Sequence, residues 1–347
     1  MTDSALIGPV AAPDLHVMSF NIRRRLPHLN ARSPDRWVHR RPLLKRLLAA
    51  EQPALIGVQE ALFDQANFVR HALGDRYRSI GYGRETNRGG EGCPILYDSR
   101  RLRVREWKQT ALSETPSQPG STSWGNRTPR IVVDALFHDI ATGIDFQAVN
   151  THFDHRSRTS RLRSADVLRR IVSASQLPTI VTGDFNTGTN TAPYDRLTGQ
   201  GLLLDTWETA DERLTDGWGT FLNYRPPHGN HKRIDWILVT PVVTVLKAAI
   251  NVKRYEGGWP SDHAAMQAVV NLGAPPPSAD LLCGKVQWLT TGTANGRSGA
   301  GPGAADSPDE WPIRASWPAA TSRPATAGET DAAREPRART RVLPTPS

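Results

Sequence analysis

The tetrapeptide Gly183-Asp184-Phe185-Asn186 follows a short apolar run, residues 178–182, which predicts a buried strand leading into a turn. Such a strand places a carboxylate and an amide side by side at its carboxyl end, where functional groups of layered α/β sheets commonly gather. An acid beside an amide suits a hard cation, or a water molecule held against a phosphate. Because a Gly-Asp pair is also ordinary turn chemistry, the significance of this stretch depends on the rest of the chain.

The composition of the 347-residue chain changes near residue 273. The remainder is rich in Pro, Ala, Gly, Ser, Thr and Arg and has no sustained apolar period, which predicts a disordered low-complexity tail over residues 274–347. The working domain is expected over residues 12–273. The tail has eight Lys/Arg and seven Asp/Glu, so most of the net charge of +9 belongs to the domain. A basic domain suggests an anionic partner such as nucleic acid, phospholipid or a phosphorylated metabolite.

The cysteine content and the hydropathy pattern suggest a compartment. The two cysteines, Cys93 and Cys283, imply no disulfide framework and favour a reducing environment. Residues 1–13 lack the basic-then-apolar order of a signal peptide, and no run approaches the roughly 20 apolar residues that span a bilayer. We therefore expect a cytoplasmic monomer without a transmembrane segment. Cys93 precedes an apolar run and is expected in the core, not as a nucleophile.

Polar side chains stand at the mouths of several other predicted strands. Residues 15–20 alternate as a strand should and end at Asn21, and the apolar residues 54–59 are closed by Glu60. A glutamate there is costly unless it is solvated, paired or metal-bound. The full set at or near predicted strand mouths is Asn21, Glu60, Glu91, His152, Asp184, Asn186, Asp235, Asp262 and His263.

Helices are predicted over residues 37–50, 62–73 and 160–174, and the first and third have an apolar stripe. The strand–helix–strand unit over residues 15–60 predicts a right-handed parallel crossover. The third helix carries several arginines outside its stripe. We interpret these as a solvated face, with a nucleic-acid track as the alternative.

Taken together, the polar set resembles that of the endonuclease/exonuclease/phosphatase superfamily, the divalent-metal phosphoesterases. The resemblance implies an α/β (α+β) fold: a four-layer sandwich of two mixed β-sheets face to face, flanked by helices, with the site at one end of the sheets. It extends over residues 17–270 and rests on six segments in the family's order: Ser19-Phe20-Asn21, Gln59-Glu60, Asn150-Thr151-His152, Gly183-Asp184-Phe185-Asn186, Arg233-Ile234-Asp235 and Ser261-Asp262-His263.

The resemblance also implies a metal site. Glu60 would be the principal ligand of Mg²⁺, or of Mn²⁺ in its place, with Asn21 and Asp262 near the same ion. Asp184 and Asn186 would hold the attacking water and a phosphate oxygen, or a second metal ion.

Two histidine–acid pairs follow from the resemblance as well. Asp235 would orient His263, and Glu91 would pair with His152. The residues expected to contact the substrate phosphate are Arg130, with Arg127 as its competitor, and Asn150.

The expected function is hydrolysis of a phosphodiester, in nucleic acid, by a metal-dependent nuclease. The alternatives are a lipid or sugar-phosphate phosphoesterase of the same superfamily and a non-catalytic binding protein on the same fold. A nuclease needs a basic groove with aromatic stacking surfaces, whereas a small substrate needs a narrow walled pocket. Trp124, Tyr224 and Trp259 could serve either, and the general base could be Asp184 or His263.

Overall fold

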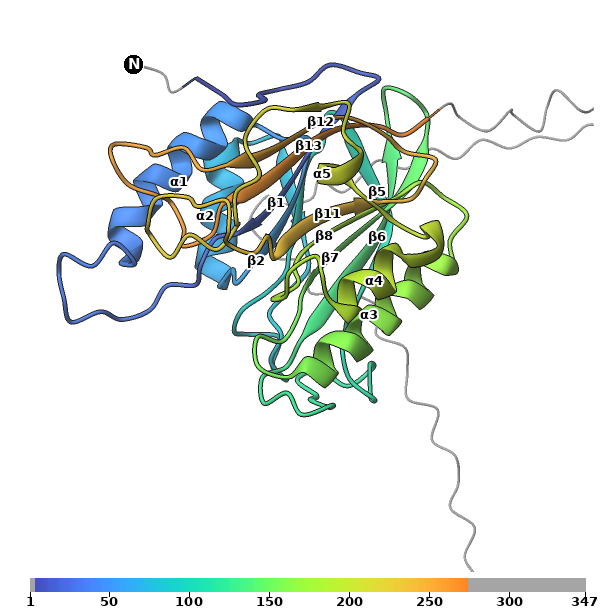
Figure 1. Ribbon diagram of the computed structural model, residues 1–347, viewed down its shortest axis with the longest axis horizontal. Coiled ribbons are helices and arrows are strands. Elements are labelled where there is room, and N and C mark those ends of the chain that lie inside the picture. Colours follow the sequence, from blue (N-terminus) through green and yellow to red (C-terminus); the bar gives the residue numbers. More distant parts are fainter. Residues whose placement is uncertain (1–3, 274–347) are drawn as a thin grey trace, which may run out of the picture. The chain divides into compact units, whose positions relative to one another are not determined.

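A computed structural model of the protein describes residues 4–273, and Figure 1 shows how its elements are arranged. One sheet contains seven strands: β1 (Leu15–Asn21), β2 (Leu55–Gln59), β3 (Tyr77–Ile80), β4 (Ile95–Asp98), β10 (Glu212–Arg213), β12 (Thr244–Asn251) and β13 (Ala265–Asn271). Their order is β10-β12-β13-β1-β2-β4-β3. Strands β1 and β2 are parallel, as the predicted crossover requires, and β1 and β13 are antiparallel, so the sheet is mixed.

The other sheet contains six strands: β5 (Leu102–Ala111), β6 (Ile131–Asp139), β7 (Asp145–His152), β8 (Thr179–Asp184), β9 (Leu204–Asp205) and β11 (Asp235–Val239). Their order is β5-β6-β7-β8-β11-β9. Strands β7 and β8 are parallel, whereas β8 and β11 are antiparallel. The helices are α1 (Trp37–Glu51), α2 (Phe63–Leu73), α3 (Arg158–Ser173), α4 (Ala192–Thr198), α5 (Thr206–Thr209) and a 3₁₀ turn (Gly199–Gly201).

Three buried apolar clusters separate the layers of the fold. One fills the space between the sheets and includes Val17 of β1 and Phe137 of β6. A second packs the seven-stranded sheet against α1 and α2, where Leu44 is fully buried. A third packs the six-stranded sheet against α3 and α4, where Leu168 is fully buried. The layers therefore run helices, sheet, sheet, helices, and the predicted sandwich fold is confirmed (Figure 1).

The strands predicted over residues 15–20, 54–59 and 178–182 correspond to β1, β2 and β8, and the three predicted helices correspond to α1, α2 and α3. Strand β12 has no predicted counterpart, because a bulge between Val245 and Lys247 interrupts its alternation. Cys93 is buried, and burial raises the pKa of its thiol to about 12, as suits a core residue. None of the helices within residues 4–273 is long and apolar enough to cross a membrane. The tail predicted over residues 274–347 lies outside the described residues.

Strand register brings the polar strand ends together. In the parallel pair β7–β8, His152 is opposite Asp184, and in the antiparallel pair β8–β11, Asp184 is opposite Asp235. In the other sheet Asn21 is opposite Gln59, so Glu60 follows immediately. The strand-end residues of the two sheets meet at one end of the sandwich, where Asn21 Nδ2 donates to Asp184 Oδ2.

Candidate active site

A pocket of about 450 Å³ lies at this end of the sandwich. Its size is at the compact end of the range for small-molecule sites. The residues that line it are Arg23, Arg24, Glu60, Arg84, Glu91, Thr128, Arg130, His152, His155, Asp184, Asn186, Phe221, Asn223, Ile234, Asp262 and His263.

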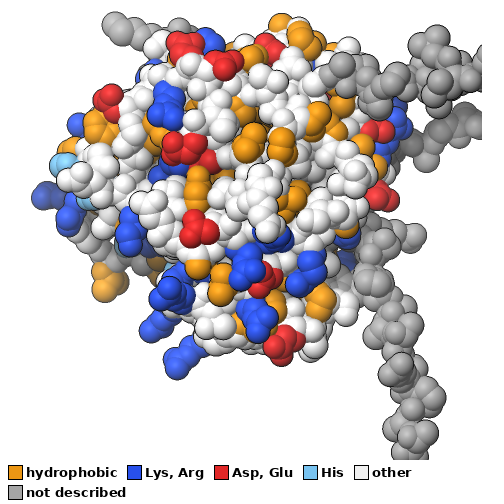
Figure 2. Space-filling view, turned by 45° about the vertical axis from the view of Figure 1, so that its right-hand side comes forward, with side chains coloured by type: hydrophobic (Ala, Val, Ile, Leu, Met, Phe, Trp, Pro, Cys, Tyr) orange, Lys and Arg blue, Asp and Glu red, His pale blue; other side chains and the backbone are white. Residues whose placement is uncertain are grey.

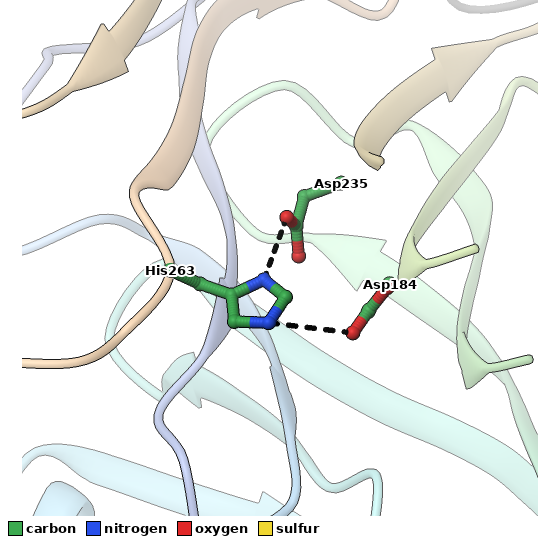
Figure 3. Close-up of side chains that lie close together, drawn as sticks. All are labelled: Asp184, Asp235 and His263. Carbon is green, nitrogen blue, oxygen red and sulfur yellow. Dashed lines mark hydrogen bonds and ion pairs between the residues drawn. The ribbon is translucent and has the colours of Figure 1, made fainter. Parts of the chain in front are cut away.

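His263 lies between two carboxylates (Figure 3). Its Nδ1 is 2.9 Å from Asp235 Oδ2, and its Nε2 is 3.9 Å from Asp184 Oδ2. Burial alone would lower the pKa of His263, but the negative charges of Asp235 and Asp184 outweigh it and raise the pKa well above 6.5. The predicted His263–Asp235 pair is therefore present, and the imidazole is held in its protonated form.

The carboxyl group of Asp184 is buried, so its charged form is poorly solvated. Burial, followed by the repulsion from Asp235, raises the pKa of Asp184 to about 7. The hydrogen bond from Asn21 Nδ2 to Asp184 Oδ2, 2.9 Å long, opposes this shift. A carboxylate with a pKa near neutrality can accept and release a proton at physiological pH.

His152 also approaches Asp184, with its Nε2 3.4 Å from Asp184 Oδ2. Asn186 Nδ2 donates to His152 Nε2 at 2.9 Å and to the carbonyl of Phe153 at 3.0 Å. Since His152 Nε2 is the acceptor, the ring is neutral and carries its proton on Nδ1. Burial lowers the pKa of His152 well below 6.5, and the positive charges of Arg130 and Arg84 lower it further.

Glu60 sits where the chain turns sharply after β2. Its φ is +59°, in the left-handed region, and Arg23 (φ +55°) and Asn186 (φ +51°) share this conformation. Such backbone costs about 1–3 kcal/mol per residue and clusters at functional sites. Asn21 Nδ2 donates to Glu60 Oε1 at 3.1 Å, and the amide of Arg24 donates to Glu60 Oε2 at 3.1 Å.

The residues at this end fit a divalent cation. Carboxylate and amide oxygens are the ligands that Mg²⁺ prefers, and Glu60 and Asp262 supply carboxylates here. Asn21 lies beside them, with its Nδ2 facing Glu60 and its Oδ1 accepting from the backbone amide of Arg23 at 2.9 Å. Burial and the charge of Glu60 raise the pKa of Asp262, although the charges of His263 and Arg23 oppose this shift. The positive side chains nearby therefore do not fully compensate the negative charge of the Asp262 carboxylate. A further donor group comprises Asp184, Asp235 and His263, whose ligand atoms lie within 4.8 Å of one another.

Arg23 lies close to the predicted metal ligands. Its Nε is 3.5 Å from Asp262 Oδ2, and its Nη1 is 3.9 Å from Glu60 Oε2. The same guanidinium donates to Asp35 Oδ2 at 3.2 Å. Arg23 therefore spans the two carboxylates, a contact that sequence reasoning did not anticipate.

The predicted pair of His152 and Glu91 is not formed. Both oxygens of Glu91 contact Arg84, at 2.7 Å from Nη1 and 2.8 Å from Nη2, and Arg24 Nη1 lies 2.9 Å from Glu91 Oε1. The Glu91 carboxylate is therefore paired with Arg84 and Arg24. His152 instead contacts Asn186 and Asp184. Sequence reasoning missed Arg24 and Arg84, because an isolated loop arginine carries no local signal.

Asn150 does not reach the pocket, contrary to its predicted role at the substrate phosphate. It is fully buried, and its Nδ2 donates to the carbonyls of Val58 at 2.9 Å and Cys93 at 3.0 Å. Its Oδ1 accepts from Gln59 Nε2 at 2.7 Å. The side chain joins the two sheets, and Gly57 leaves the room for it, because a Cβ there would lie 2.7 Å from Asn150 Oδ1.

Arg130 lines the pocket, whereas its competitor Arg127 is exposed and does not. Arg130 Nε is 3.4 Å from Asp154 Oδ2, and its Nη2 is 3.0 Å from His155 Nδ1. Its Nη1 is buried and has no hydrogen-bond partner within residues 4–273. A fixed guanidinium with an unused donor is suited to an anionic ligand.

The three aromatic side chains that could stack against a substrate, Trp124, Tyr224 and Trp259, lie outside the pocket lining. Trp124 Nε1 donates to Glu114, Trp259 Nε1 donates to the carbonyl of Val252, and Tyr224 donates to Asp35. Phe221 is the one Phe, Tyr or Trp among the lining residues, and its ring centroid lies 5.1 Å from that of His263.

The endonuclease/exonuclease/phosphatase family model matches residues 18–263. An endonuclease/exonuclease/phosphatase from Bacteroides vulgatus is 32% identical, with a TM-score of 0.69, over 75% of this chain and 99% of its own. A mannosyl-6-phosphatase from Bacteroides thetaiotaomicron is 30% identical, with a TM-score of 0.70, over 74% of this chain and 99% of its own. TDP2 from D. rerio, complexed with a single-strand DNA product, is 17% identical, with a TM-score of 0.57, over 75% of this chain and 99% of its own.

A search of curated proteins found no match. The family model nevertheless covers most of the described residues, and its limits enclose all of the polar residues at the strand ends. The chain belongs to the endonuclease/exonuclease/phosphatase family, whose members are divalent-metal-dependent phosphoesterases.

Proposed function

We propose that this protein hydrolyses a small phosphorylated substrate, a sugar or polyol phosphate, with Mg²⁺ or Mn²⁺ as cofactor. The observation that carries the proposal is the character of the pocket. It is compact, about 450 Å³, and its walls carry arginines and carboxylates with one Phe as the sole Phe, Tyr or Trp. A nucleobase would need aromatic stacking surfaces, whereas a phosphorylated polyol needs hydrogen-bonding groups. The 30% identity to a mannosyl-6-phosphatase supports the same substrate class.

Glu60 and Asp262 would hold the metal ion, with Asn21 beside it. When bound, the ion draws negative charge from the phosphate and favours attack at phosphorus. Arg130 would bind a phosphate oxygen through its unused Nη1 donor. Asn186 would hold Asp184 in position, since the backbone N–H of Asn186 donates to Asp184 Oδ1 at 2.9 Å.

The two candidate bases differ in what they can do. Because Asp235 keeps His263 protonated, His263 is suited to donate a proton or to stabilise charge, and not to accept a proton. Asp184, whose pKa burial and Asp235 raise to about 7, is suited to take the proton of the attacking water. We therefore assign Asp184 as the general base and His263 as the acid. The water oxygen bonds to phosphorus, the ester P–O bond breaks, and the leaving oxygen is protonated.

A nuclease is the second candidate, and the net charge of +9 favours it. Figure 2 shows Lys and Arg side chains on one face of the molecule, with Asp and Glu among them. On α3, Arg163 and Arg170 are exposed, but neither lines the pocket. The basic surface therefore gives weaker support than the pocket does.

The deciding experiment compares glucose 6-phosphate and p-nitrophenyl phosphate with bis-p-nitrophenyl phosphate and single-stranded oligonucleotides. Each is tested with Mg²⁺, with Mn²⁺ and with chelator, and Asp184→Asn serves as the inactive control. We expect metal-dependent release of phosphate from the monoesters. Cleavage of oligonucleotides alone would establish the nuclease instead, and binding without cleavage of any substrate would favour a non-catalytic protein.

A separate measurement tests the metal ligands. A ligand at 100 times its dissociation constant raises the free energy of unfolding by about 2.7 kcal/mol. We expect Mg²⁺ or Mn²⁺ to stabilise the wild type against urea by an amount of this order, and to stabilise Glu60→Ala much less. An equal response of Glu60→Ala would remove Glu60 from the metal site.

A further inference from the structure

Arg24, Arg84 and Glu91 form one wall of the pocket, and we call this group the Glu91 clamp. We propose that the Glu91 clamp determines substrate specificity by binding hydroxyl groups of the substrate's leaving group. The proposal rests on the proposed phosphoesterase function and deepens it, because it assigns recognition of the polyol to named residues. It also gives Glu91 a role in binding in place of the predicted pairing with His152.

The geometry of the clamp is that of a fork-to-fork ion pair. Arg84 Nη1 and Nη2 lie 2.7 and 2.8 Å from the two Glu91 oxygens, and Arg24 Nη1 lies 2.9 Å from Glu91 Oε1. The side chains of Glu91 and Arg84 are 8% and 13% exposed, and that of Arg24 is 43% exposed. Buried ion pairs contribute little net stability, because desolvation offsets their attraction. A pair placed in a pocket wall is better explained by ligand recognition than by stability.

The backbone fixes the clamp. The amide of Arg84 donates to the carbonyl of Glu91 at 2.9 Å, so the two residues lie side by side on opposite arms of one loop. The arms approach too closely for a side chain at Gly83, where a Cβ would lie 1.9 Å from the carbonyl oxygen of Gly89. Gly90 has a φ of +72°, which favours glycine. The loop therefore holds the carboxylate and the guanidinium in a defined relation.

Arg24 connects the clamp to the predicted metal site. Its amide donates to Glu60 Oε2 at 3.1 Å, while its guanidinium contacts Glu91. The predicted metal ligand and the clamp are thus joined through a single residue, and both line the same pocket. A phosphate bound near Glu60 would place its ester group within reach of the clamp.

The donors and acceptors of the clamp match a hydroxyl better than an anion. A second phosphate would meet the Glu91 carboxylate, which already occupies donors of both arginines and would repel it. A hydroxyl both donates and accepts, so neighbouring hydroxyls can bond to the carboxylate and to the remaining guanidinium N–H groups together. The clamp offers no flat apolar surface for a nucleobase. The chemistry it selects is therefore a polyol.

The test compares glucose 6-phosphate with n-hexyl phosphate, which has a similar length but no hydroxyls, as the ratio of their kcat/KM values. We expect a ratio above about 10 for the wild type, since hydrogen bonds to charged groups contribute about 1.5–3 kcal/mol. Arg84→Met should reduce this ratio at least tenfold. Arg24→Met, at a half-exposed position, tests the same point should Arg84→Met not fold. Arg163→Met, on α3 outside the pocket, is the matched control and should keep the wild-type ratio.

Several results would overturn the clamp. One is a kcat/KM ratio near one for the wild type, and another is a ratio that neither Arg84→Met nor Arg24→Met reduces. A third is a preference for glucose 1,6-bisphosphate that Arg84→Met removes, because this would show that the clamp binds an anion. If the wild type hydrolyses neither monoester, the proposed function fails. Calorimetric titration of glucose 6-phosphate and n-hexyl phosphate into the chelator-treated protein then tests the clamp separately, and equal affinities would overturn it.

Discussion

Two buried histidines of the pocket approach the same carboxylate, Asp184, in different charge states. His263 Nε2 lies 3.9 Å from Asp184 Oδ2, and His152 Nε2 lies 3.4 Å from the same atom. Burial lowers both pKa values, but Asp235 raises that of His263 well above 6.5, whereas Arg130 adds to the lowering at His152. The hydrogen bonds agree with this difference, because His263 faces an acceptor and His152 faces the Asn186 donor.

The charges around each ring set its chemistry. A histidine backed by a carboxylate is a charged acid, and a histidine surrounded by arginines is a neutral acceptor. The two histidines consequently have different tasks. His263 would supply the proton for the reaction, and His152 would hold Asp184 and Asn186 in place.

The largest expected effect comes from removing the charged histidine. We expect His263→Ala to lower kcat about 10³-fold, since a positioned acid or base contributes about 10²–10⁴-fold. The measurement is steady-state hydrolysis of p-nitrophenyl phosphate at saturating metal. His71→Ala, at an exposed position on α2, is the control. A loss below tenfold for His263→Ala would show that His263 is not the catalytic acid, and the proposed difference between the two histidines would then fail.

A third buried histidine, His16, tests what burial does without a catalytic partner. Its Nδ1 lies 2.8 Å from the carbonyl of Gly8, and burial lowers its pKa from 6.5 to about 4, against an opposing charge on Glu51. The unfolded chain therefore binds a proton between these values that the folded chain does not. As the pH falls from 6.5 to 4, His16 should cost the fold about 3 kcal/mol.

Urea unfolding of the wild type and His16→Gln at several pH values measures this contribution. Asp184 acts in the opposite direction, because its raised pKa makes the folded chain bind the proton first as the pH falls. The difference between the two proteins isolates His16, since Asp184 is common to both. Identical pH profiles would show that His16 has the same pKa in the folded and the unfolded chain, and that burial does not lower the pKa of this histidine.

The sequence sufficed to predict the fold and most strand-end residues, because strand patterns are local and register then brings Asp184 and Asp235 together. It failed at Asn150 and Glu91, where the outcome depends on distant segments. Asn150 lies two residues inside the end of β7 and meets β2 of the opposite sheet. The partners of Glu91 depend on the path of two loops, which no periodic pattern encodes.

A smaller effect is expected from removing the carboxylate behind His263. Asp235→Asn should lower kcat about 10–100-fold, as is usual for residues that orient a catalytic ligand. The pKa of His263 should fall, since Asp235 is the main charge that raises it. Activity that requires protonated His263 is lost as the pH rises through this pKa, so the alkaline limb of the kcat profile should move to lower pH. An unchanged limb would assign it to another group.

The smallest expected effect comes from the neutral histidine. His152→Gln keeps a polar group near Asn186 Nδ2, so the substitution weakens at most about one hydrogen bond, which contributes about 0.5–1.5 kcal/mol. We therefore expect kcat to fall by less than about tenfold. Because the substitution removes no charge, the alkaline limb should keep its position, in contrast to Asp235→Asn. A loss as large as that of His263→Ala would mean that His152 takes part in proton transfer, and the two histidines would then act as a pair despite their different pKa values.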